Sequence, residues 1–155
     1  MDNLKIPVGT SDFAEIRQNG YYYVDKTVLI SELLKTASNK VTLITRPRRF
    51  GKSLGMSMLE NFFDIRKDSR TLFAGLEISQ NKALCDEWMN QYPTISVSFS
   101  RVFGLNYTKA YDMLTMVIAD LFNKHLYLIQ NGKGTDFENS TFKHLADGCA
   151  SEKEI

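Results

Sequence analysis

The chain has 155 residues, of which 43% are hydrophobic and 24% charged, and this composition is ordinary for a single soluble globular domain. The formal net charge of +1 excludes a global field that would attract nucleic acid or a membrane, so any basic patch must be local. No apolar run approaches the roughly 20 residues of a membrane span. The N-terminus also lacks the apolar stretch of a signal peptide, so we expect a cytoplasmic protein.

Three elements are predicted in the first forty residues. Ser11 precedes a short helix over residues 12–17, whose apolar side chains fall on one face. The run Tyr-Tyr-Tyr-Val at 21–24 is a strand candidate, because aromatic and β-branched residues favour strands. Asp25 then caps a second helix, whose apolar residues within 29–34 lie on one side.

Residues 41–53 are the most informative stretch and read Val-Thr-Leu-Ile-Thr-Arg-Pro-Arg-Arg-Phe-Gly-Lys-Ser. A β-branched run over 41–45 predicts a buried strand, a basic loop follows, and Gly51-Lys52-Ser53 opens a helical pattern. This order is the context of a phosphate-binding (Walker A) loop. The unpaired N–H groups and the positive dipole end of such a helix suit a polyphosphate. We therefore expect a nucleotide polyphosphate here, with Lys52 reaching the β- and γ-phosphates and the Ser53 hydroxyl binding Mg²⁺.

The loop departs from the usual pattern G-x-x-x-x-G-K-[ST] at its first position. Arg46 stands where a glycine normally gives the tight turn, and Pro47 biases it towards extended geometry. Arg46, Arg48, Arg49 and Lys52 can strengthen phosphate binding through charge-assisted hydrogen bonds. The predicted nucleotide-binding residues are Arg46, Pro47, Arg48, Arg49, Phe50, Gly51, Lys52, Ser53 and Leu54. The alternative left open is a solvated basic loop before an ordinary helix.

Helices dominate the prediction after the loop, with one further strand. Apolar residues recur at helical spacing over 54–63, where Met56 and Met58 are interpreted as core filler and not as metal or cofactor ligands. Another short helix is expected around 84–89. Residues 94–99 alternate strictly and have a β-rich composition, which predicts a strand.

The longest amphipathic helix is predicted over residues 107–129, with apolar residues at spacings of three and four. His125 lies near its end, where a cation suits the dipole, so a capping or surface role is expected. The tail from residue 136 to 155 is polar. A short helix is expected there near Phe142 and Leu145, and the last residues are expected to fray.

The groups needed for phosphoryl transfer are incomplete in this sequence. Magnesium normally needs a second ligand, an acid at the end of an apolar strand, and the apolar run that ends in Asp120 falls inside a helical period. Asp120 is therefore interpreted as a solvated helix carboxylate with Lys124 as its partner, and Asp25 as a helix cap. Cys85 and Cys149 have no metal-ligand spacing, so we expect reduced thiols. We assign no catalytic residue and no metal cluster.

Five segments give the chain a resemblance to a known family. They are, in order, residues 6–13, 22–27, 43–53, 58–63 and 93–99. The block Arg-Pro-Arg-Arg-Phe-Gly-Lys is the most specific of these. On these residues the chain resembles the N-terminal part of the prokaryotic AAA-ATPase-like proteins, which are predicted P-loop ATPases often followed by a PD-(D/E)XK-type nuclease domain. The family tolerates Arg at the position of the lost glycine.

The resemblance implies an α/β fold, a P-loop NTPase-like three-layer α/β/α arrangement with an incomplete central sheet. Residues 1–155 would be the N-terminal part of one such domain. A helical and strand segment would occupy 1–40, part of the P-loop core 41–130, and a loose tail 131–155. Family members continue with an acidic (Walker B) strand of the type Leu-Ile-Asp-Glu-Tyr-Asp, and nothing like it occurs here. The resemblance therefore implies a fragment that binds ATP but is not expected to hydrolyse it alone.

The expected partners follow from the same considerations. Open edges of an incomplete sheet invite self-association or a protein partner, and nucleic acid could be reached through the full-length protein. Two alternatives to Mg-ATP binding stay open. The arginine loop could grip a nucleic-acid backbone, in which case binding weakens steeply as salt rises. The chain could instead be a scaffold that is indifferent to nucleotide.

Overall fold

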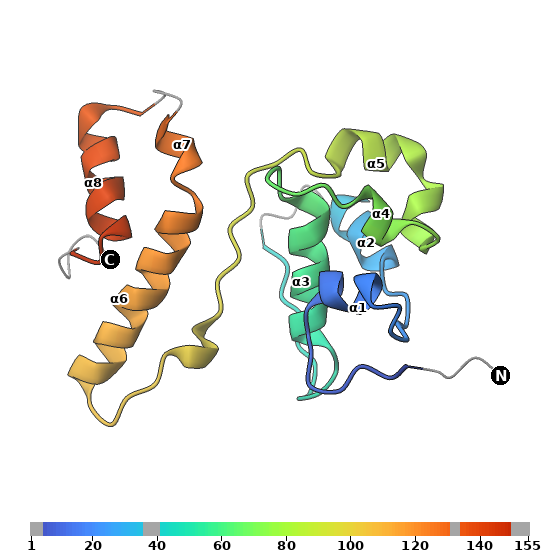
Figure 1. Ribbon diagram of the computed structural model, residues 1–155, viewed down its shortest axis with the longest axis horizontal. Helices are drawn as coiled ribbons and strands as arrows, with labels where there is room; N and C mark the ends of the chain where they lie inside the picture. The colour runs from blue at the N-terminus through green and yellow to red at the C-terminus, as the bar shows by residue number, and fades with distance from the viewer. Residues whose placement is uncertain (1–4, 36–40, 131–133, 150–155) are drawn as a thin grey trace. The chain divides into compact units, whose positions relative to one another are not determined.

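Helices make up nearly all of the regular secondary structure in the computed structural model, which describes residues 5–35, 41–130 and 134–149 (Figure 1). The chain divides into two compact units, Met1–Thr94 and Ile95–Ile155. The first contains α1 (Phe13–Gln18), α2 (Val28–Lys35), α3 (Lys52–Phe63), α4 (Arg70–Phe73), the 3₁₀ helix η1 (Glu77–Gln80) and α5 (Lys82–Trp88). The second contains the 3₁₀ helix η2 (Phe99–Arg101), α6 (Tyr107–Lys124), α7 (Tyr127–Gln130) and α8 (Asp136–Ala146).

The predicted α/β fold, a three-layer α/β/α arrangement with a central sheet, is wrong. The described residues form no sheet, and their β-structure is limited to an isolated parallel bridge between Asp64 and Tyr92. The strands predicted at 21–24, 41–45 and 94–99 do not form. The expectation that open sheet edges promote self-association loses its basis with the sheet.

The two longer predicted strands carry strand-forming side chains but lack strand partners. Val41 and Leu43 are 83% and 82% exposed, and Ile95 and Phe99 are exposed as well. Such a run becomes a strand where a neighbour pairs with its backbone and one face is buried, because β-propensity reflects packing more than the backbone itself. No described segment pairs with either run. The two runs therefore have the side chains of a strand without forming one.

The predicted helices are present and differ mainly at their ends, whereas α4, η1 and η2 were not predicted. Asp12, and not Ser11, is the N-cap of α1, because its carboxylate accepts hydrogen bonds from two N–H groups of the first turn. The helix predicted over 107–129 ends earlier as α6, with His125 as its C-cap, and the chain resumes a helix in α7. The short helix expected in the tail is present as α8. The fraying expected at the end of the tail falls on 150–155, outside the described residues.

Helix α3 is the centre of the first unit. Its residues Met58 and Phe62 are fully buried in one cluster with Phe13 of α1, Ile30 of α2 and Phe73 of α4. The ring centroids of Phe13 and Phe62 lie 4.8 and 5.3 Å from that of Phe73. Burial of each such side chain contributes roughly 1.5–3 kcal/mol. The core therefore holds the second half of α3 and leaves its first turn at the surface.

Asn90 anchors the C-terminal end of α3. Its amide nitrogen donates to the carbonyl oxygens of Asn61 and Asp64 at 3.1 and 2.9 Å, and its amide oxygen accepts the Ser69 N–H at 2.9 Å. Asn90 has a φ of +57°, a left-handed conformation that Asn adopts more readily than most residues. One side chain thus satisfies three backbone groups, one in the last turn of α3 and two just beyond it.

In the second unit, α6 and α8 lie side by side (Figure 1). The rings of Phe122 and Phe142 meet edge-on with centroids 4.7 Å apart, and the amide of Asn123 donates to a carbonyl oxygen at the end of α8 at 2.6 Å. α8 begins with a capping box, in which Thr135 and Glu138 satisfy each other's backbone N–H groups. The second unit is therefore a helical hairpin with its own contacts.

Both cysteines are free, as predicted. Cys85 is buried and its thiol lies 3.3 Å from the Ile78 carbonyl oxygen, whereas Cys149 is exposed. Over the parts of the chain that the structure describes, no cluster of three or more His, Cys, Asp or Glu side chains could hold a metal ion. None of the helices there combines the length and the apolar character that crossing a bilayer requires.

We expect Asn90→Ala to lower the free energy of unfolding by about 3 kcal/mol, because three buried backbone groups lose their partner and alanine resists a positive φ. Asn90→Gly loses the same hydrogen bonds but accepts the backbone conformation, so its loss should be smaller by about 1 kcal/mol. Urea denaturation of the two variants and the wild type measures both differences. An alanine variant as stable as the wild type would contradict the anchoring role.

Candidate functional site

Two residues with left-handed backbone shape the loop before α3. Arg49 has a φ of +67° and Gly51 a φ of +78°. Glycine adopts this conformation freely, whereas it costs a residue with a Cβ roughly 1–2 kcal/mol. Backbone strain of this kind tends to cluster at sites that bind ligands. The strained Arg49 therefore marks this loop as a candidate site.

The first turn of α3 presents unpaired backbone donors. Gly51 is the N-cap and has no side chain that could cap the helix. The N–H groups of Lys52, Ser53 and Leu54 consequently have no acceptor within the helix. No acidic residue lies in the first turn. The positive end of the helix dipole is therefore available to an external anion.

The ammonium group of Lys52 ties the start of the loop to the start of α3. Its Nζ atom donates to the carbonyl oxygens of Arg46 and Pro47, the latter at 3.0 Å. Lys52 is exposed, and an ammonium group offers three donors. An arriving anion can therefore compete with the two carbonyl oxygens for this group.

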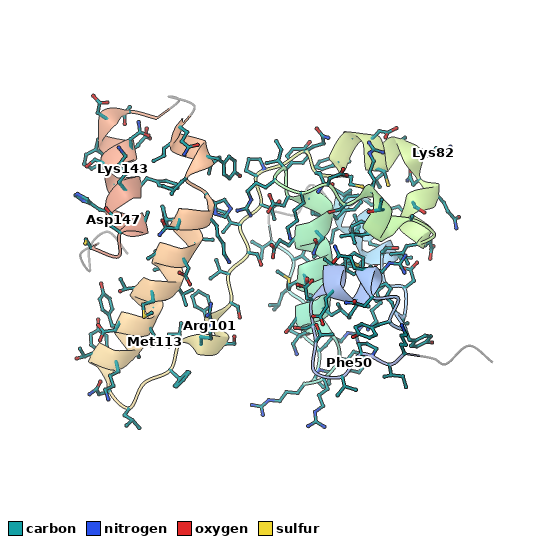
Figure 2. All side chains as sticks on the ribbon, viewed as in Figure 1. Phe50, Lys82, Arg101, Met113, Lys143 and Asp147 are labelled. Atoms are coloured by element: carbon teal, nitrogen blue, oxygen red, sulfur yellow. The ribbon has the colours of Figure 1, made fainter. Side chains whose placement is uncertain are left out.

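Phe50, labelled in Figure 2, lies next to the N-cap of α3 and is flanked by two cations. The Arg46 guanidinium lies 5.7 Å and the Lys26 ammonium 6.0 Å from the ring centroid. Lys26 Nζ also lies 3.5 Å from the Phe50 carbonyl oxygen. Such cation–π contacts contribute about 0.5–1 kcal/mol each at exposed sites. Phe50 thus contacts cations from two segments that are distant in sequence.

An anchored segment, residues 22–27, brings Lys26 to the loop. Tyr23 on this segment is half-buried, and its hydroxyl donates to the sulfur of Met58 at 3.3 Å. The ring of Tyr23 also meets that of Phe13 edge-on, with centroids 5.3 Å apart. The segment is therefore fixed to the core through Tyr23, and Lys26 extends from it towards the loop.

Asp25 fixes the backbone next to Lys26. Its carboxylate accepts the N–H and the hydroxyl of Thr27 at 2.8 and 2.7 Å, and the N–H of Glu77 at 2.7 Å. Burial alone would raise the pKa of Asp25, but these hydrogen bonds outweigh it and lower the pKa below its ordinary value. Asp25 is therefore structural, but it is not the predicted cap of α2, because its carboxylate accepts from Thr27, which precedes the helix, and from Glu77 of η1.

A cavity of about 540 Å³ opens beside the loop. Three cations line it, Lys26, Arg46 and Lys52, and none of its lining residues is acidic. The other lining residues are Leu29, Thr42, Ile44, Phe50, Gly51, Gly55, Met56 and Met58. Cavities that bind small molecules are typically about 300–1,000 Å³ and mostly apolar, with a few placed polar groups. The cavity is thus suited to an anionic ligand with an apolar part.

The structure brings together some of the predicted site residues and not others. Those that line the 540 Å³ cavity are Arg46, Phe50, Gly51 and Lys52. Those that line a second cavity beside it are Arg49, Phe50, Gly51 and Leu54. Those that line neither are Pro47, Arg48 and Ser53. Ser53 is exposed in the first turn of α3, and its role as an Mg²⁺ ligand stays a prediction.

The predicted site did not include several residues that line the cavity, among them Lys26 and Met56. Lys26 was not identified, although it lies within 22–27, one of the segments that carry the family resemblance. Met56 was interpreted as core filler, but it is 51% exposed and lines the cavity. The same interpretation is correct for Met58, which is fully buried.

Asp120 and His144 belong to the second unit. Asp120 is on α6, its side chain is 65% exposed, and it lies 3.9 Å from the guanidinium of Arg101. This placement agrees with its interpretation as a solvated helix carboxylate. His144 is exposed on α8. Neither residue lines the loop cavity or its neighbour.

Comparison with known proteins gives two similarities. The model of the AAA-ATPase-like family, described as "Predicted AAA-ATPase", matches residues 7–154. An uncharacterized protein from the vnfD 5′ region of Azotobacter chroococcum mcd 1 is 35% identical over 100 residues. This match covers 64% of the present chain and 18% of that protein, so the chain spans a small part of its relative. No solved structure matches the chain.

The strain at Arg49 can be measured with a pair of variants that remove the same charge. Arg49→Gly relieves the left-handed strain and Arg49→Ala does not, so the glycine variant should have the larger free energy of unfolding, by about 1 kcal/mol. Chemical denaturation of both variants side by side gives this difference. Because glycine is otherwise the less favourable residue in a folded chain, an alanine variant of equal or greater stability would rule out the left-handed conformation.

The lowered pKa of Asp25 predicts a pH-dependent contribution to stability. The contribution is present above the unfolded-state pKa of about 3.9 and is lost as pH falls through the lower folded-state value. Asp25→Asn should lower the free energy of unfolding by about 1 kcal/mol at pH 7, and by less as pH approaches 2. Denaturation of both proteins between pH 7 and pH 2 measures this difference. A difference that stays constant with pH would exclude the charged carboxylate as its origin.

Proposed function

Because the chain belongs to the predicted AAA-ATPase family, we propose that it binds ATP with Mg²⁺ at the loop of residues 46–53 and the first turn of α3. The observation that carries the proposal is the convergence of Lys26, Arg46 and Lys52 on one cavity beside that helix terminus. A polyphosphate would meet fixed N–H donors and the positive end of the helix dipole here. It would also meet three cations, and no acidic residue lines the cavity to repel it.

The proposal assigns the phosphates to the side of the cavity formed by Lys52 and the first turn of α3. Lys52 would exchange its contacts with the loop carbonyl oxygens for phosphate oxygens, and Lys26 would approach from the anchored segment. Ser53 is exposed in the same turn, so its hydroxyl would serve as a ligand for Mg²⁺. Magnesium bound there would neutralise charge on the phosphates.

The proposed function is binding, not turnover. Phosphoryl transfer normally requires a further acid for the metal and a group that positions the attacking water. None of the residues lining the loop cavity is acidic. The two free thiols support the further proposal that the protein works in the reducing cytoplasm, where such thiols persist.

Isothermal titration calorimetry with Mg-ATP tests the proposal directly. We expect saturable binding by the wild type and a roughly 10- to 100-fold weaker affinity for Lys52→Ala, since hydrogen bonds to charged groups contribute about 1.5–3 kcal/mol. Lys35→Ala removes an equally exposed lysine from the end of α2, and it should bind like the wild type.

Two results would count against nucleotide binding at this loop. A folded wild type that gives no heat at millimolar Mg-ATP would remove the proposal, as would equal affinities of Lys52→Ala and the wild type. Salt-sensitive binding of single-stranded DNA by a chain that ignores ATP would favour the nucleic-acid alternative. Circular dichroism of each variant ensures that only folded proteins are compared.

A further inference from the structure

A second cavity of about 380 Å³ lies beside the first and shares Lys26, Phe50, Gly51 and Gly55 with it. The residues that line the second cavity alone are Pro7, Ile16, Tyr22, Tyr23, Val24, Arg49 and Leu54. Its lining residues are mainly apolar and aromatic, none is acidic, and its cations are Lys26 and Arg49. The two cavities therefore offer different chemistry on either side of Gly51.

The wall of this cavity opposite α3 is held in place before any ligand arrives. The backbone N–H of Tyr22 donates to the Lys5 carbonyl oxygen at 2.7 Å, which joins this segment to the one that carries Pro7. The next residue, Tyr23, is fixed in the core by its contacts with Phe13 and Met58. A wall fixed in this way loses little conformational freedom on binding.

Tyr22 differs from the other two aromatic residues of the cavity. Phe50 already contacts two cations, and Tyr23 packs in the core. The ring of Tyr22 is on a residue that is 52% exposed, and it has no aromatic or cationic partner among the described residues. A planar, apolar ligand group can therefore stack on it.

We propose that this second cavity binds the nucleobase of the nucleotide, with Tyr22 as its stacking platform. The inference rests on the proposed function, because the phosphates must lie at the first turn of α3. Lys26, Phe50, Gly51 and Gly55 line both cavities, so the two are neighbours and one nucleotide can contact both. Stacking of a base on an aromatic ring needs no hydrogen-bond pattern, so purine and pyrimidine nucleotides should both bind.

The test compares ATP with inorganic tripolyphosphate, which has the phosphates but no base. For the wild type, ATP should bind at least tenfold more tightly than tripolyphosphate. Tyr22→Ala should weaken ATP binding by about tenfold and leave tripolyphosphate binding unchanged. Lys52→Ala should weaken the binding of both ligands. All affinities are measured by calorimetry in the presence of Mg²⁺.

Three further variants separate stacking from general effects. Tyr22→Phe keeps the ring and should bind ATP like the wild type, whereas Tyr22→Leu keeps apolar bulk without a planar face and should behave like Tyr22→Ala. Tyr21→Ala alters the neighbouring tyrosine, which lines neither cavity, and should retain wild-type affinity. If Tyr22→Ala does not fold, the leucine variant carries the test.

The outcomes distinguish this inference from the proposed function. If ATP and tripolyphosphate bind equally well and the Tyr22 variants change neither, the nucleotide site stands but the base does not lie on Tyr22. If the folded wild type binds neither ligand, the proposed function fails and the base site fails with it. A Tyr22→Leu variant with wild-type affinity for ATP would also overturn stacking.

Discussion

The second half of helix α3 is packed in the core, whereas its first turn lies at the surface. Met58 and Phe62 bury it in the aromatic core, and Asn90 ties down the chain beyond its C-terminal end. A helix held in this way cannot tilt without opening the core, so its N-terminal donors keep a fixed direction. The loop, the cations and both cavities are all arranged around that fixed terminus. Preorganised dipoles of this kind favour a charged ligand without a cost for reorienting them.

The segment of residues 22–27, which precedes the loop in the chain, is anchored to the same core. Its side chains alternate in role, since Tyr23 packs in the core while Tyr22 lines the second cavity and Lys26 reaches the loop. Asp25 locks the backbone between them and connects it to η1. The candidate site is thus built by two segments that meet on one core, and neither would be sufficient alone.

The longer helices and the loop before α3 could be predicted, because helical periodicity and the tripeptide Gly-Lys-Ser are local signals, whereas the short α4, η1 and η2 were not predicted. The prediction of strands at 41–45 and 94–99 was wrong. The side-chain pattern of a segment indicates that it could form a strand, but it does not reveal whether another segment pairs with it. Lys26 was missed because its proximity to Phe50 is set by the tertiary fold, through the burial of Tyr23. Met56 and Met58 are the same residue type and received the same interpretation. Because they are two positions apart on a helix, they face different directions, and only Met58 is buried.

The contacts of Lys52 with its own loop have a consequence for the kinetics of ligand association. The ammonium already donates to the Arg46 and Pro47 carbonyl oxygens, so an incoming anion meets one remaining donor and competes with the carbonyl oxygens for the other two. Association then includes a step in which the loop releases the lysine, and this step does not depend on ligand concentration. Because only molecules with a released lysine would bind at full strength, the apparent Kd would be the intrinsic Kd divided by the fraction of those molecules.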